Sequence, residues 1–127
     1  MAELIEKKLV YEIMGCAMEV HNEVGYGLCE KMVERALCRE FGLQNISYSQ
    51  QALYPVFYKG EKIDEYIPDL VVEGRVVVDT KTIDAIGDVE RGKMLNYLRI
   101  TGLRIGLIIN FKNLKLEWER IVLDTAR

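Results

Sequence analysis

The chain has 127 residues, which is about the size of one domain. Half of the residues are apolar and 29% are charged, a balance that excludes disordered, collagen-like and low-complexity chains. No apolar run approaches the roughly 18 residues of a membrane-spanning helix, and the acidic start lacks the pattern of a signal peptide. The three cysteines form no CxxC pair, which fits a reducing compartment. We therefore expect a single domain over residues 1–127, located in the cytoplasm and with no contact to a membrane.

Two helices are predicted at the start of the chain, followed by a region rich in strands. Apolar residues recur at spacings of three and four over about residues 3–24, which predicts the first helix. The second helix is predicted over residues 28–41, with Gly42 as its stop. Short runs of β-branched and aromatic residues then predict three strands. These strands are expected at about residues 47–58, 62–72 and 75–82.

A third helix and two further strands complete the predicted fold. The helix fits residues 88–101, with Asp88 as its N-cap and Gly102 directly after its last turn. A near-continuous apolar run predicts a buried strand over residues 103–109, and a last strand is predicted over residues 114–122. The resulting order, α-α-β-β-β-α-β-β, combines hairpins with a crossover helix. It predicts an α/β or α+β protein with a mixed sheet flanked by helices.

The stretch from Tyr66 to Lys81 carries the most chemical information. Two aliphatic segments in it each contain an acid where burial favours an aliphatic residue, and these acids are Asp69 and Asp79. Because side chains alternate along a strand, Asp79 and Lys81 project from one face and Thr80 from the other. A buried acid and a buried base both need a partner, since desolvation of an unpaired charge is costly.

The turn between these two segments decides whether the acids meet. A two-residue turn pairs Val72 with Arg75 and points Asp69 away from Asp79. A three-residue turn pairs Val72 with Val76 and sets the two acids opposite each other, with Cβ atoms about 5 Å apart. Carboxylates that close repel unless a proton or cation lies between them, and Mg²⁺ is the natural occupant. A plain hairpin with solvated acids is the other possibility, and the residues alone leave both open.

Several motifs resemble known proteins. Pro68-Asp69, followed after nine residues by Asp79-Thr80-Lys81, is similar to the signature of the PD-(D/E)XK nuclease superfamily. Other stretches resemble the GxxExxY proteins, a small branch of that superfamily. They are residues 21–30, 58–60, 66–70, 95–98, 101–104 and 109–111. The resemblance extends from about residue 5 to residue 123 and implies a restriction-endonuclease-like fold.

The resemblance also implies an activity and a site. Asp69 and Asp79 would ligate a divalent metal, Mg²⁺ or Mn²⁺, with the main-chain carbonyl of Thr80 assisting. Lys81 would orient or help deprotonate the attacking water and offset charge on the phosphate, and Glu30 would complete the site. The implied reaction is metal-dependent hydrolysis of phosphodiester bonds in nucleic acid, and DNA is the expected substrate.

The chain departs from the family pattern at three positions. Val33 stands where the name motif has Tyr, Asp79 stands where Glu is more usual, and Lys93 replaces a Gln four residues before Tyr97. The last third of the chain carries 8 bases against 3 acids. We expect Lys93, Tyr97 and Arg91 to contact the substrate there, because phosphate contacts dominate nucleic-acid affinity.

Two alternatives remain from the sequence. The chain can be a catalytically inactive module that keeps the nuclease fold for binding or assembly, or a structural subunit of a homodimer. A domain this small has little surface for reading a sequence, so a homodimer or a protein partner is expected. Uptake of Mg²⁺ or Mn²⁺ that depends on Asp69 separates an intact site from an inactive one.

Overall fold

The computed structural model describes residues 5–124. Its elements are, in chain order, α1 (Lys7–Val24), α2 (Glu30–Leu43), β1 (Tyr48–Gln50), β2 (Tyr54–Tyr58), β3 (Glu61–Tyr66), β4 (Leu70–Val72), β5 (Val76–Lys81), α3 (Asp88–Thr101), β6 (Ile105–Asn110) and β7 (Glu117–Val122). The first residues of the first predicted helix lie outside the described range. Among the helices of residues 5–124, none combines the length and the apolar content needed to cross a bilayer.

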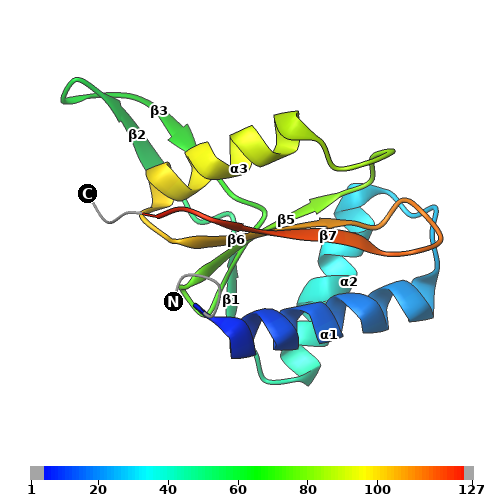
Figure 1. The fold of residues 1–127 in the computed structure, drawn as a ribbon. Helices are drawn as coiled ribbons and strands as arrows, with labels where there is room; N and C mark the ends of the chain where they lie inside the picture. Colours follow the sequence, from blue (N-terminus) through cyan, green and yellow to red (C-terminus); the bar gives the residue numbers. More distant parts are fainter. Residues whose placement is uncertain (1–4, 125–127) are drawn as a thin grey trace.

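A five-stranded sheet lies between two layers of helices (Figure 1). Its strand order is β1-β4-β5-β6-β7, with β5 and β6 parallel and the other neighbours antiparallel. Helices α1 and α2 cover one face, and α3, the crossover between the two parallel strands, covers the other. The predicted α/β class, the mixed sheet and its flanking helices are therefore confirmed, and the architecture is consistent with a restriction-endonuclease-like fold.

Each face of the sheet carries its own apolar core. The larger core packs α1 and α2 against one face and includes Val76 and Val78 of β5. The smaller core packs α3 against the other face and includes Val77 and Ile108. Because both faces are covered, the central strands are apolar at nearly every position, and β5 ends in a buried environment.

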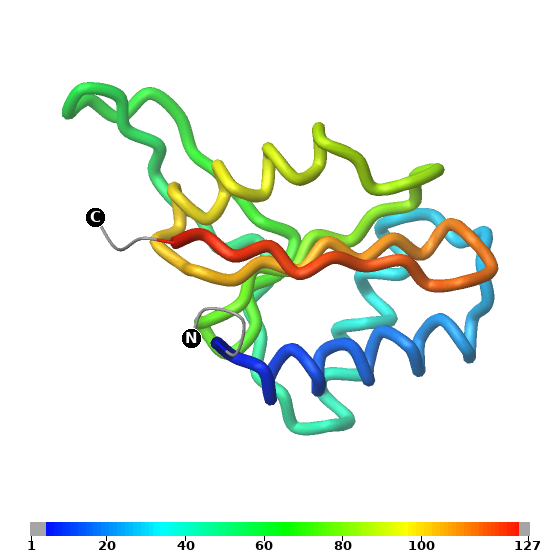
Figure 2. The backbone as a smooth tube through the Cα atoms, viewed as in Figure 1, coloured from blue at the N-terminus to red at the C-terminus, as the bar shows by residue number. Residues whose placement is uncertain are grey.

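The remaining two strands form a separate hairpin, which divides two of the predicted strands. The region 47–58 is split into β1 and β2 at Gln51, whose φ of 61° interrupts the extended chain. The region 62–72 is split into β3 and β4 by residues 67–69, which include Pro68. Within residues 5–124, strands β2 and β3 pair only with each other, and the hairpin extends past the end of α3 (Figure 2). The element order thus follows the expected one, with two strands each divided.

The predicted end of the second helix was wrong by two residues. Helix α2 continues through Gly42 to Leu43, and Phe41 is completely buried in the larger core. The left-handed conformation that closes the helix falls on Asn45, with φ 60°. Asn tolerates this conformation better than most residues, so the glycine is not needed there.

The bounds of α3 match the prediction, but its N-cap is a different residue. Gly87 is the N-cap, and its N–H donates to the Glu90 carboxylate at 2.8 Å, while Asp88 is the first helical residue. Gly102 follows the helix with φ 76°, as predicted. The last strand begins at Glu117, because the residues before it form an exposed turn.

Candidate metal centre

The pairing of β4 with β5 shows which turn joins them. Val72 pairs with Val76, so the turn has three residues, and Gly74 within it has φ 65°. Asp69 directly precedes β4 and therefore lies opposite Asp79 in the same register. Of the two turns left open by the sequence, the chain adopts the one that brings the acids together.

Three carboxylates and one ammonium group gather at this end of β5. Glu30, Asp69 and Asp79 each offer one oxygen, and these three atoms lie within 4.8 Å of one another. Glu30 reaches the cluster because it is the first residue of α2. Lys81 is two residues beyond Asp79 on the same face, and its Nζ lies 3.5 Å from Asp79 Oδ2. Helix α2 and two strands thus converge on one point.

Thr80 fixes the orientation of Asp69. Its main-chain N–H and its hydroxyl both donate to Asp69 Oδ2, at 3.1 and 3.3 Å. Thr80 is completely buried, so these donors have little freedom to move. One oxygen of Asp69 is held by the neighbouring strand, which restricts the position of the whole carboxylate. The resemblance implied a role for the Thr80 carbonyl only, and this orienting contact was not predicted.

The electrostatics of the cluster reflect its burial and its excess of acids. Burial raises the pKa of Asp79 to about 7, with nearby Asp69 adding to the effect and Lys81 opposing it. Burial followed by repulsion from Asp69 also raises the pKa of Glu30. Burial alone would lower the pKa of Lys81, but attraction to Asp79 and Glu30 outweighs it, and the pKa is raised. Negative charge in the cluster is therefore costly, and one ammonium does not balance it.

The donor set fits a divalent cation. All three donors are carboxylate oxygens, which hard cations such as Mg²⁺ and Mn²⁺ prefer. A cation between these oxygens would relieve the repulsion that raises the pKa values of Asp79 and Glu30. The residues present can thus hold such a metal, and the adjacent Lys81 supplies a positive donor beside it.

Two tyrosines pack together beside the cluster. The rings of Tyr66, at the end of β3, and Tyr97, on α3, are stacked with centroids 4.2 Å apart and an interplanar angle of 14°. Burial, and then the proximity of Asp79, raises the pKa of both phenols. Tyr97 was predicted as a site residue, whereas no role in the site was predicted for Tyr66. The position of Tyr66, three residues before Asp69, was the sequence signal that could have placed it near the site.

The two basic residues predicted to contact substrate have different surroundings. Lys93 is exposed on α3, one turn before Tyr97. Arg91 donates from Nε and Nη2 to the Glu119 carboxylate, both at 2.7 Å, and from Nη1 to Asp88 at 2.9 Å. Arg91 thus joins α3 to β7, and a phosphate would have to compete with this ion pair. Its substrate contact stays a prediction.

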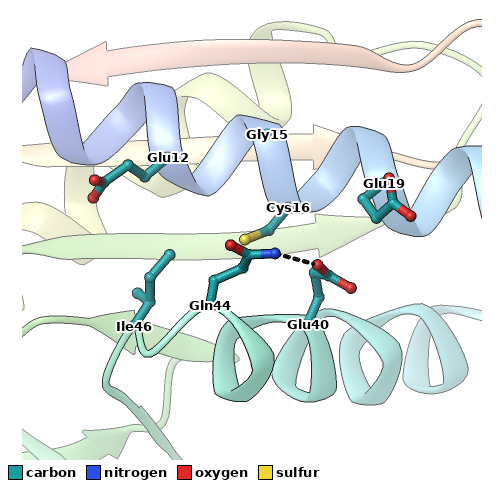
Figure 3. Close-up of a pocket in the computed structure, with 7 residues that line it drawn as sticks. All are labelled: Glu12, Gly15, Cys16, Glu19, Glu40, Gln44 and Ile46. Atoms are coloured by element: carbon teal, nitrogen blue, oxygen red, sulfur yellow. Dashed lines mark hydrogen bonds between the residues drawn. The ribbon is translucent and has the colours of Figure 1, made fainter.

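A groove of about 530 Å³ between α1 and α2 shares no lining residue with the cluster (Figure 3). Glu12, Glu19 and Glu40 line it, together with Cys16. Burial, and then the proximity of Glu40, raises the pKa of the Cys16 thiol to about 11. The thiol is therefore protonated at neutral pH and a poor nucleophile, so the groove offers no chemistry comparable to that of the cluster.

Comparison with known proteins agrees with this geometry. A family model described as the PD-(D/E)XK nuclease superfamily matches residues 7–121. No curated protein and no solved structure matches the chain. The family match covers most of the chain and includes all three carboxylates and Lys81. The chain belongs to the PD-(D/E)XK nuclease superfamily.

Proposed function

We propose that this protein is a magnesium-dependent nuclease of the GxxExxY branch that hydrolyses phosphodiester bonds in DNA. Metal-dependent cleavage of nucleic acid is the chemistry that the superfamily suggests. The observation that carries the proposal for this chain is the convergence of Glu30, Asp69 and Asp79 within 4.8 Å, beside Lys81. We further propose that residues 1–127 act as one nuclease domain.

Glu30, Asp69 and Asp79 would hold the metal through their carboxylate oxygens, and the Thr80 carbonyl would assist. A bound divalent cation supplies a Lewis acid for the scissile phosphate and lowers the pKa of a bound water. The two hydrogen bonds from Thr80 keep Asp69 in place without metal. The ligand set would therefore be partly preorganised, which reduces the reorganisation needed when a metal enters.

Lys81 would act as a donor of positive charge. Its raised pKa keeps the ammonium protonated at neutral pH, so it is suited to orient the attacking water and to stabilise negative charge on the phosphate. Its distance of 3.5 Å to Asp79 keeps it at the edge of the cluster. A protonated lysine does not accept a proton, so we assign it no role as general base.

Substrate contacts would come from α3. Exposed Lys93 can meet a phosphate as a point charge, and Tyr97 lies one turn further along the same helix. Arg91 would take part only if its ion pair with Glu119 opened. The small size of the domain also fits work beside a second copy or a protein partner.

Cleavage assays on DNA and RNA with Mg²⁺ or Mn²⁺ test the proposal. We expect Asp79→Asn and Lys81→Met each to lower the cleavage rate by a factor of about 100 or more, because the first removes a metal ligand and the second removes the positive charge that stabilises the phosphate. Asp84→Asn is the matched control, since Asp84 is exposed and its carboxylate forms an ion pair with Lys112, away from the cluster. Unchanged rates in the first two variants would refute the assigned site.

Calorimetric titration with Mn²⁺ separates this proposal from an inactive nuclease-fold module. The parent should take up metal, and Asp69→Asn should bind it much more weakly because one of three carboxylate ligands is lost. A parent chain that neither binds Mn²⁺ nor cleaves would be the binding or assembly module instead.

A further inference from the structure

A hollow of about 280 Å³ lies between the hairpin and the last turns of α3. Pro55, Val56 and Phe57 of β2 line one side, and Arg99 and Ile100 of α3 line the other. Phe57 is 62% exposed although it is a large apolar side chain. An aromatic ring and a guanidinium plane are the two protein groups on which nucleobases stack. The hollow therefore presents both of them at one open site.

Charge is distributed unevenly around the hollow. Strand β2 carries no charged residue, but Asp64 and Glu65 of β3 pair with Val56 and Pro55, which line the hollow. Beyond its first turn, α3 carries basic residues and no acid. Arg99 donates to Asn96 Oδ1 at 2.9 Å and forms no ion pair within residues 5–124, so its remaining donors can meet a phosphate. The positive charge that a phosphate can meet at the hollow therefore comes from Arg99 of α3 and not from the hairpin.

The stacked tyrosines tie this hollow to the metal centre. Tyr66 ends the hairpin and Tyr97 lies on α3, so their contact joins the same two elements that form the hollow. The chain continues from Tyr66 to Asp69 in three residues. Arg99 follows Tyr97 by two residues on α3, a rise of about 3 Å along the helix axis. A strand held at the metal centre therefore needs few nucleotides to reach the hollow.

We propose that the hollow between β2 and α3 binds a base of single-stranded nucleic acid whose backbone follows α3 from the metal centre. The base would stack on Phe57 and Arg99, and Ile100 would contact its edge. The inference rests on the proposed function and specifies its substrate as single-stranded. A base-paired strand cannot place a base in the hollow, because its bases already stack within the duplex.

Binding of fluorescein-labelled oligo(dT) of about 12 nucleotides, long enough to span α3, tests the inference by fluorescence anisotropy with EDTA present. The parent should bind this probe more tightly than a blunt duplex of the same length. Phe57→Ala should weaken binding about tenfold or more, the usual effect of losing one base-stacking aromatic. Phe57→Trp should retain the affinity, and Arg99→Gln should lower it.

Tyr11→Ala is the matched control, because Tyr11 is an 81% exposed aromatic on α1, across the sheet from the hollow. It should bind as the parent does. Equal affinity of the parent and Phe57→Ala would overturn the inference, as would a parent that does not bind or prefers the duplex. Because EDTA prevents cleavage, binding through Phe57 without any nuclease activity would refute the proposed function alone.

Discussion

Removing the charge of Asp79 should stabilise the metal-free protein at alkaline pH. Burial raises the pKa of this carboxyl to about 7 from its ordinary value of 3.8. Each tenfold change in acidity corresponds to about 1.4 kcal/mol, so ionised Asp79 costs the folded state about 4 kcal/mol. Asn has a similar shape and never ionises, so Asp79→Asn removes this cost.

The pH dependence has a definite sign. Between pH 3.8 and 7 the folded state binds more protons at Asp79 than the unfolded state, so stability falls as pH rises through this range. The advantage of Asp79→Asn should therefore be absent near pH 3.8, grow up to about pH 7 and stay constant above it. At pH 8 it corresponds to a melting temperature higher by roughly 15 °C.

Thermal unfolding with EDTA at pH 8 and near pH 4 measures the effect. In the parent, Mn²⁺ should then restore stability at pH 8, because a cation among the carboxylates offsets their repulsion, whereas Asp79→Asn should respond weakly. A variant that is less stable than the parent at pH 8 would show that ionised Asp79 is well accommodated without metal. The carboxylate cluster would then need no cation to be stable.

Two further predictions concern the packing around α3. Gly106→Ala should destabilise the protein by about 1–3 kcal/mol in urea denaturation, because the added Cβ would overlap the Met94 side chain, which α3 places against β6. The same change at Gly92, which has open space around it, should instead stabilise α3 by about 0.5–1 kcal/mol. Equal changes in stability at the two positions would contradict the packing of Met94 against Gly106. Tyr66→Ala should lower the free energy of unfolding by about 2 kcal/mol or more, whereas Tyr66→Phe keeps the stack on Tyr97 and should stay close to the parent. If Tyr66→Phe lowers the free energy of unfolding as much as Tyr66→Ala does, the hydroxyl and not the ring stack holds the hairpin.

The parts of the fold that the sequence predicted well have strong local signals. Helix α3 lies within its predicted bounds, since Gly102 marks its end. The breaks in the strands were not predicted, because Gln51 gives no sign of its left-handed conformation. Likewise, α2 passes through Gly42 because packing of Phe41 outweighs the local preference of a glycine to end a helix.

The site was predictable only in part for a similar reason. Asp79 and Lys81 share a face by strand alternation alone, so their proximity follows from the sequence. Glu30 is 39 positions before Asp69, and only tertiary packing brings the first residue of α2 to the end of β5. The ion pair of Arg91 with Glu119 likewise depends on how α3 lies across β7. Charge counts in the sequence cannot show that this arginine already has a partner.

The short turn between β4 and β5 has a consequence for how this nuclease fold can lose its activity. Leu70, Val71 and Val72 are all buried, since helices cover both faces of the sheet. Inserting or deleting one residue in the turn would reverse the facing of β4 yet still bury three aliphatic side chains. Asp69 would then point away from Asp79, and the proposed metal centre would be lost while both acids remained in the sequence. Among related chains, the length of this turn should therefore report a working centre more faithfully than the acids themselves.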